Sequence, residues 1–95
     1  MKVEAKKRVE KDLEKVPKYV QEMAAANIKI LKAANNLHEI ENVRHMKGTK
    51  EPYYRMKFND YRFLLYYDEE SNILTIRALT HRKDAYKKEN LPWCK

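Results

Sequence analysis

Residues 53–67 read YYRMKFNDYRFLLYY, and they decide the fold. Apolar and polar side chains alternate with a period of two on both sides of Asn59-Asp60, which is the spacing of a half-buried β-strand. Asn and Asp tolerate the left-handed backbone of a tight turn. The pattern therefore predicts a β-hairpin with strands over residues 53–58 and 61–67.

The register of this hairpin sorts its side chains onto two faces. If Phe58 pairs with Tyr61, then Lys57 faces Arg62 and Arg55 faces Leu64. One face is apolar and is expected to join the core, whereas the other is basic and aromatic. The predicted core face holds Tyr54, Met56, Phe58, Tyr61, Phe63, Leu65 and Tyr67, and the predicted basic face holds Tyr53, Arg55, Lys57, Arg62, Leu64 and Tyr66.

A further strand follows the hairpin. Turn-forming residues at 68–72 separate the hairpin from a second alternating stretch, residues 73–81. Regular alternation predicts that Leu74, Ile76 and Ala78 join the core face, and that Arg77, Leu79 and His81 join the basic face. After this strand, residues 84–90 are predicted to form a short helix.

The first third of the chain has helical spacing. Apolar residues recur at positions 9, 13 and 16 up to Pro17, and again from Val20 to the Asn35-Asn36 pair. Residues 37–51 are expected to be a connection with a short extended piece, and residues 1–4 are too short to assign. We therefore expect an α+β fold in which two N-terminal helices pack on an antiparallel β-sheet meander.

The composition indicates a small basic domain. The chain has 95 residues with 21 Lys and Arg against 14 Asp and Glu, so its formal net charge is +7. This length predicts one domain over residues 1–95. Residues 43–67 contain six cations and two anions, so the excess positive charge is concentrated there.

Several classes of protein are excluded by the sequence. The longest apolar run, residues 63–67, is far shorter than the 18 or so residues of a membrane span. Residues 1–20 carry charges throughout and lack the apolar segment of a secretory signal. Cys94 is the only cysteine, which excludes an internal disulfide and a CxxC zinc site. We therefore expect a cytoplasmic protein without membrane contact, metal or cofactor.

The basic face suggests an anionic ligand. Like charges directly opposite each other, as at Lys57 and Arg62, are unfavourable unless an anion lies between them. Arginine matches phosphate oxygens and tyrosine stacks on unpaired bases, a combination typical of single-stranded RNA sites. A solvated face with long side chains lying over apolar neighbours is the alternative. The predicted RNA-binding residues are Tyr53, Arg55, Tyr66, Arg77 and Lys83.

The sequence HRKDAY, residues 81–86, adds groups that suit catalysis. His81 is able to exchange a proton near neutral pH, and it stands beside Arg82 with Tyr86 close by in sequence. This grouping is typical of a nuclease site. His38 and His45 lack such neighbours, so His81 is the candidate for proton transfer.

Four segments of the chain together resemble a known family. They are AKKRVEKDLEKVP at 5–17, MKG at 46–48, YRMKF at 54–58 with DYRFLLY at 60–66, and HRKDAY at 81–86. Over nearly its whole length the chain resembles RelE/ParE-family type II toxins, in particular the RelE-like mRNA interferases. The resemblance implies a RelE-like fold and a toxin that cuts mRNA in the ribosomal A site. It also implies a cognate antitoxin that keeps the toxin inactive.

The resemblance also implies a reaction and roles for individual residues. The ribose 2′-hydroxyl attacks the adjacent phosphodiester without metal, giving a cyclic phosphate and a free 5′-hydroxyl. The roles that it implies are proton exchange by Lys57 or His81, charge stabilisation by Arg62 and Arg82, and nucleotide stacking or orientation by Tyr86.

Two other functions are consistent with the same sequence. A ParE-like relative would inhibit DNA gyrase by binding alone and would need no acid or base. A non-catalytic RNA-binding or ribosome-associated module would need only the basic aromatic face. The joint presence of basic residues and His81 favours the nuclease over both alternatives.

Overall fold

The computed structural model describes residues 1–87 and 90–92, so Trp93 and Cys94 lie outside it. In the described part, two helices and one 3₁₀ helix accompany a sheet of five strands. The elements are β1 (Lys2–Ala5), α1 (Lys7–Glu14), α2 (Lys18–Ala33), the 3₁₀ helix η1 (Leu37–Glu39), β2 (Val43–His45), β3 (Tyr53–Phe58), β4 (Tyr61–Asp68) and β5 (Ile73–His81).

The strand order is β1-β5-β4-β3-β2. Strands β2 to β5 form the predicted antiparallel meander, with β2 as the short extended piece in the 37–51 connection. Strand β1 was not predicted. It pairs in parallel with β5, Lys2 lying opposite Ile73, and such a distant partner is invisible in a four-residue segment.

The two predicted N-terminal helices and the predicted hairpin are confirmed. Pro17 caps the N-terminus of α2, where its missing N–H is no loss. In the hairpin, Phe58 pairs with Tyr61 and Lys57 with Arg62, as predicted. Asn59 adopts the left-handed backbone that this turn requires, with φ of 57°.

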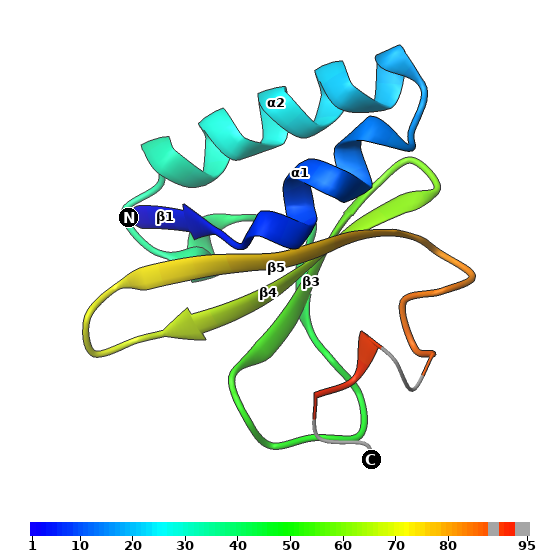
Figure 1. The fold of residues 1–95 in the computed structure, drawn as a ribbon. Helices are drawn as coiled ribbons and strands as arrows, with labels where there is room; N and C mark the ends of the chain where they lie inside the picture. The colour runs from blue at the N-terminus through cyan, green and yellow to red at the C-terminus, as the bar shows by residue number, and fades with distance from the viewer. Residues whose placement is uncertain (88–89, 93–95) are drawn as a thin grey trace.

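Helices α1 and α2 both cover the same face of the sheet, as Figure 1 shows. Between them lies the main core, and Phe63 is its largest fully buried side chain. We call the other face of the sheet the open face. It carries a smaller cluster of Met46, Leu64, Ala78 and Ala85, where the segment after β5 returns against the sheet.

A β-bulge interrupts the pairing of β4 with β5. Leu65 pairs with Ile76 but Leu64 pairs with Ala78, so Arg77 is an extra residue in β5. Side chains that follow the bulge therefore point to the opposite face from the one that regular alternation predicts. The prediction was wrong beyond this point: Leu79 lies in the main core at 4% exposure, and Ala78 belongs to the cluster on the open face.

The prediction of a helix over residues 84–90 was wrong for residues 84–87, which form turns and a bend. The Asp84 N–H donates to the carbonyl of His81 over 2.8 Å, and the Lys87 N–H donates to that of Asp84 over 3.1 Å. The buried Asn90 side chain also donates to the Asp84 carbonyl, over 2.6 Å. These local bonds close the turns, while the packing of Ala85 against Met46 and Leu64 and the hydrogen bond from Arg8 to Asn90 hold the segment against the rest of the domain.

Among the described residues, the helices are too short or too polar to span a membrane.

Candidate active site on the open face

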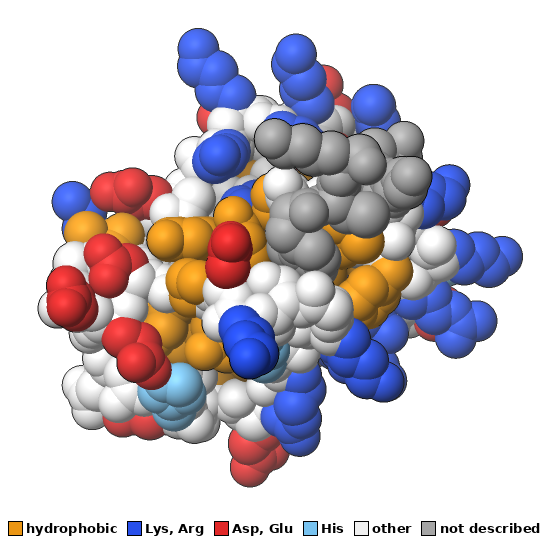
Figure 2. Space-filling view, turned by 90° about the horizontal axis from the view of Figure 1, so that it is seen from below, with side chains coloured by type: hydrophobic (Ala, Val, Ile, Leu, Met, Phe, Trp, Pro, Cys, Tyr) orange, Lys and Arg blue, Asp and Glu red, His pale blue; other side chains and the backbone are white. Residues whose placement is uncertain are grey.

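The regular β3–β4 hairpin places three predicted site residues on the open face. Lys57 and Arg62 lie directly opposite each other, and Arg55 lies one side-chain row further along β3. Lys57 is exposed, whereas Arg55 and Arg62 are half-buried. Figure 2 views this face and shows hydrophobic side chains in its middle, Asp and Glu gathered on the left, and Lys and Arg along the right.

Arg62 lies at the centre of a group of cations. Its guanidinium donates to the backbone carbonyls of Tyr61, over 2.9 Å, and Asn59, over 3.2 Å. Burial lowers the pKa of Arg62 below its ordinary value, and the neighbouring charges of Arg55 and Arg82 lower it further. The site therefore concentrates positive charge that an anion would stabilise.

Arg82 reaches this group from the turn after β5. Its backbone N–H donates to the carbonyl of Asp60 over 2.7 Å, and its guanidinium lies 3.6 Å from the Asp60 carboxylate. Asp60 also opposes the lowering of the Arg62 pKa. The hairpin turn thus anchors Arg82 beside Arg62, and Asp60 offsets part of the local positive charge.

Tyr86 lies over Arg55. Its phenol oxygen accepts hydrogen bonds from the Arg55 guanidinium, over 2.7 Å, and from the backbone N–H of Lys47, over 3.1 Å. The carbon of the Arg55 guanidinium is 5.8 Å from the centre of the Tyr86 ring. Since the phenol oxygen accepts both bonds, its own hydrogen is able to point toward a ligand. At 41% exposure, the Tyr86 side chain is accessible to one.

The prediction that His81 shares this face was wrong. His81 pairs with Tyr61, and their rings meet edge to face at 5.3 Å on the helix-covered side of the sheet. There His81 lines a pocket with Arg8 and Asp12 of α1. The bulge at Arg77 is the physical reason, because it reverses the direction of every side chain that follows it in β5.

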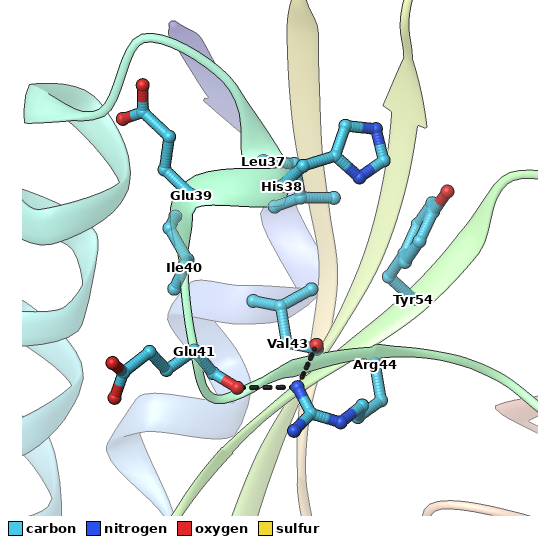
Figure 3. A pocket seen from close by; sticks show the side chains of 8 residues that line it. All are labelled: Leu37, His38, Glu39, Ile40, Glu41, Val43, Arg44 and Tyr54. Atoms are coloured by element: carbon cyan, nitrogen blue, oxygen red, sulfur yellow. Dashed lines mark hydrogen bonds between the residues drawn. The ribbon is translucent and has the colours of Figure 1, made fainter.

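Sequence analysis missed Arg44. It lies on β2 directly opposite Arg55 and lines a small pocket with Arg55 and Lys57. Its guanidinium donates to the carbonyls of Glu41 and Val43, over 2.6 and 2.9 Å, as the dashed lines in Figure 3 show. The excess of cations over residues 43–67 was the only signal for it, because a three-residue strand has no readable alternation.

The neighbouring pocket drawn in Figure 3 has a different character. It has a volume of about 450 Å³ and lies beside strand β2 and η1. Glu39 and Glu41 line it together with Arg44, around an apolar floor that includes Ile40 and Val43. Two carboxylates make it a poor site for phosphate, so the cationic group on the open face is the better candidate.

The remaining predicted RNA-binding residues lie apart from this group. Tyr53 and Tyr66 pair across β3 and β4 with ring centres 5.3 Å apart, and Arg77 lies 4.8 Å from the centre of the Tyr53 ring. Lys83 lies in the turn after β5, where its backbone N–H donates to His81 Nδ1 over 3.3 Å. Within residues 1–87 and 90–92, no group of three or more His, Cys, Asp or Glu side chains is placed to hold a metal ion.

Comparison with known proteins identifies the family. Residues 3–86 match the model of the ParE toxin of the type II toxin–antitoxin system, parDE. The chain belongs to this ParE toxin family. It is thus a type II toxin of the RelE/ParE superfamily, and no curated protein matches it in sequence.

Several solved structures similar to this ParE-family chain are RelE toxins in complexes with RelB antitoxins. The Methanococcus jannaschii complex matches at 24% identity and a TM-score of 0.72, covering 87% of this chain and 94% of that one. The Pyrococcus horikoshii complex matches at 26% identity and a TM-score of 0.69, covering 85% and 93%. The Escherichia coli complex matches at 13% identity and a TM-score of 0.57, covering 84% and 94%. The predicted RelE-like fold is therefore confirmed.

Proposed function

We propose that this toxin is an mRNA endonuclease that cuts messages in the ribosomal A site and so inhibits translation. The observation that carries the proposal is the convergence of Arg55, Lys57, Arg62 and Arg82 beside Tyr86 on an accessible sheet face. Arginine and lysine bind the phosphodiester, and the tyrosine ring offers a surface for an unpaired base. Burial, and then the charges of Arg55 and Arg82, lower the pKa of Arg62, and a phosphate bound beside it would offset both effects.

The proposed reaction needs no covalent enzyme intermediate. The ribose 2′-oxygen forms a bond to the adjacent phosphorus while the bond from phosphorus to the 5′-oxygen breaks, giving a 2′,3′-cyclic phosphate and a 5′-hydroxyl. Whichever of Lys57 and Tyr86 is deprotonated accepts the proton of the 2′-hydroxyl, and the other gives a proton to the departing 5′-oxygen. Arg62 and Arg82 stabilise the additional phosphate charge, while Lys57 and Tyr86 carry the exchangeable protons of this face. His81 has no part in this scheme, because it lies across the sheet.

We further propose a cognate antitoxin as the protein partner. The three similar structures reported above are of toxins bound to an antitoxin. A net charge of +7, with cations grouped on an accessible face, favours a partner with acidic side chains. Mixing the two proteins should therefore abolish toxicity and RNA cleavage together.

Inhibition of DNA gyrase is the second candidate function. It is favoured by the match to the ParE toxin model and by the absence of His81 from the cationic face. A gyrase inhibitor acts by binding, so it would need neither Lys57 nor Tyr86 as a proton carrier. The two candidates therefore differ in whether mRNA is cut.

Mapping of mRNA ends separates the two functions. The toxin is induced in bacteria, and primer extension locates new 5′ ends in translated messages. We expect in-frame cuts within coding regions, and their loss in an Arg62→Ala variant that melts at the same temperature as the wild type. Intact messages accompanied by gyrase trapped on DNA would instead establish the second candidate.

A further inference from the structure

The open face contains a second cationic pocket, separate from the group around Arg62. It has a volume of about 280 Å³ and is lined by Lys6, Tyr53, Tyr66, Thr75 and Arg77. Two of these five residues are basic and none is acidic. The pocket therefore favours an anion, in contrast to the acidic pocket beside β2.

Arg77 gives this pocket its chemistry. As the extra residue of the β-bulge, it projects onto the open face, with its guanidinium stacked 4.8 Å from the centre of the Tyr53 ring. Its Nε and Nη2 atoms are buried and have no hydrogen-bond partner. Burial lowers the pKa of Arg77 further than its neighbour Tyr53 raises it. Buried donors of a charged group are costly when unpaired, and Arg77 lines the pocket, so a small shift of the guanidinium would bring these donors to a ligand with oxygen acceptors.

We infer that this pocket binds a phosphate group of the RNA strand adjacent to the phosphodiester that is cut. The inference rests on the proposed function. Tyr53 and Arg55 are two residues apart on β3, so the pocket and the cationic group lie in side-chain rows about 7 Å apart along the strand. One extended RNA strand reaches both. The 38% exposed Tyr66 ring beside the pocket supplies a surface for a base, which favours a nucleotide over a lone acidic side chain.

Binding of an uncleavable RNA tests the inference. The probe is a fluorescent 2′-O-methyl pentanucleotide, which lacks the attacking hydroxyl, and its affinity is measured by anisotropy over a range of salt concentrations. We expect Arg77→Gln to weaken binding about 10- to 100-fold. The slope of the logarithm of the affinity against the logarithm of the salt concentration should decrease in magnitude by about one.

Lys11→Gln is the control. Lys11 is exposed on helix α1, away from the open face, and its replacement removes one positive charge from the chain. We expect a loss of affinity of about twofold, from long-range charge alone. Arg77→Gln loses the stack on Tyr53 but also removes a charged group with unpaired buried donors, so we expect its melting temperature to stay close to that of the wild type. Should Arg77→Gln fail to fold, Arg77→Lys keeps the charge without the planar fork and should still weaken binding more than Lys11→Gln.

Three outcomes would overturn the inference. The first is an equal affinity of Arg77→Gln and Lys11→Gln for the RNA probe; if the wild type still cuts mRNA, the proposed function is unaffected. Wild-type toxin that binds no RNA would overturn it as well. So would a ¹⁵N NMR signal from Arg77 Nε–H that responds to an acidic antitoxin peptide but not to the RNA probe, since the pocket would then serve the protein partner.

Discussion

The β3–β4 hairpin and strand β5 use the same sheet in different ways. In the hairpin, pairing runs without interruption from Phe58 opposite Tyr61 to Tyr53 opposite Tyr66, so alternate residues keep to one face throughout. In β5 the bulge at Arg77 reverses, partway along the strand, the face to which alternate side chains point. The hairpin therefore gathers cations on the open face by alternation alone. Strand β5 instead sends Arg77 to the open face, Leu79 into the core and His81 to the helix side.

Truncating a core side chain of the hairpin or of strand β5 should cause the largest change, a loss of free energy of unfolding. Phe63 of the hairpin is fully buried, and Leu79 beyond the bulge is 4% exposed in the same core. We expect Phe63→Ala to lower the free energy of unfolding by about 3–5 kcal/mol and Leu79→Ala by about 2–5 kcal/mol. Urea unfolding measures both.

Tyr66→Ala is the control for these two variants, because its side chain is 38% exposed on the open face of β4. We expect a loss of about 1 kcal/mol or less. If Leu79→Ala were as mild as Tyr66→Ala, strand β5 would alternate regularly and the bulge would be absent. In that case His81 would return to the open face as a candidate acid or base.

The rate of RNA cleavage should also distinguish the hairpin from strand β5. Arg62 of the hairpin faces the proposed phosphate, so Arg62→Ala should lower the cleavage rate about 10²- to 10³-fold. His81 lies on the other side of the sheet, so His81→Ala should change the rate less than about threefold, the size of an indirect effect. Both are measured on translating ribosomes with thermal melts as a folding control. A large loss with His81→Ala alone would reverse our assignment of the two faces.

The difference between these regions also explains what the sequence made predictable. The hairpin register follows from residues that are close in sequence, so alternation and the Asn59-Asp60 turn were sufficient to place Arg55, Lys57 and Arg62. The bulge left no mark in the local pattern, because Leu79 fits either face of a strand. Strand β1 and the bent segment after β5 depend on partners distant in sequence, such as Ile73 for Lys2, and were beyond a local reading.

Beyond the bulge, β5 pairs with β4 on one edge and uses a side chain as a hydrogen-bond partner on the other. Strand β1 ends at Ala5, and the N–H of Leu79 donates to the Asp12 carboxylate over 2.9 Å instead of to a strand. Asp12→Ala leaves this donor without its partner and should lower the free energy of unfolding by about 1–3 kcal/mol. Asp12→Asn keeps an oxygen acceptor and should lose less. If both variants lose the same free energy of unfolding in urea, the ion pair of Asp12 with Arg8 matters more than its hydrogen bond with Leu79.

The smallest expected effect lies in the turn after β5, where Asp84 contacts Lys87 over 2.8 Å. A hydrogen bond from Lys87 lowers the pKa of the Asp84 carboxyl, desolvation opposes this effect, and the charges of Lys87, His81 and Lys83 lower the pKa further. Because the folded-state pKa is depressed, the stabilisation is present above the unfolded pKa of 3.8 and is lost as the pH falls through the folded-state pKa.

Replacing the carboxyl should remove this pH dependence. We expect Asp84→Asn to be slightly less stable than the wild type at neutral pH and to match it in acid, below the depressed folded-state pKa, where Asp84 is protonated. Urea midpoints measured from neutral pH down into acid give the difference. A deficit that persists unchanged in acid would mean that Asp84 acts through its backbone turn and not through its charge. The segment that carries Tyr86 would then be secured by hydrogen bonds alone, as the hairpin turn is at Asn59.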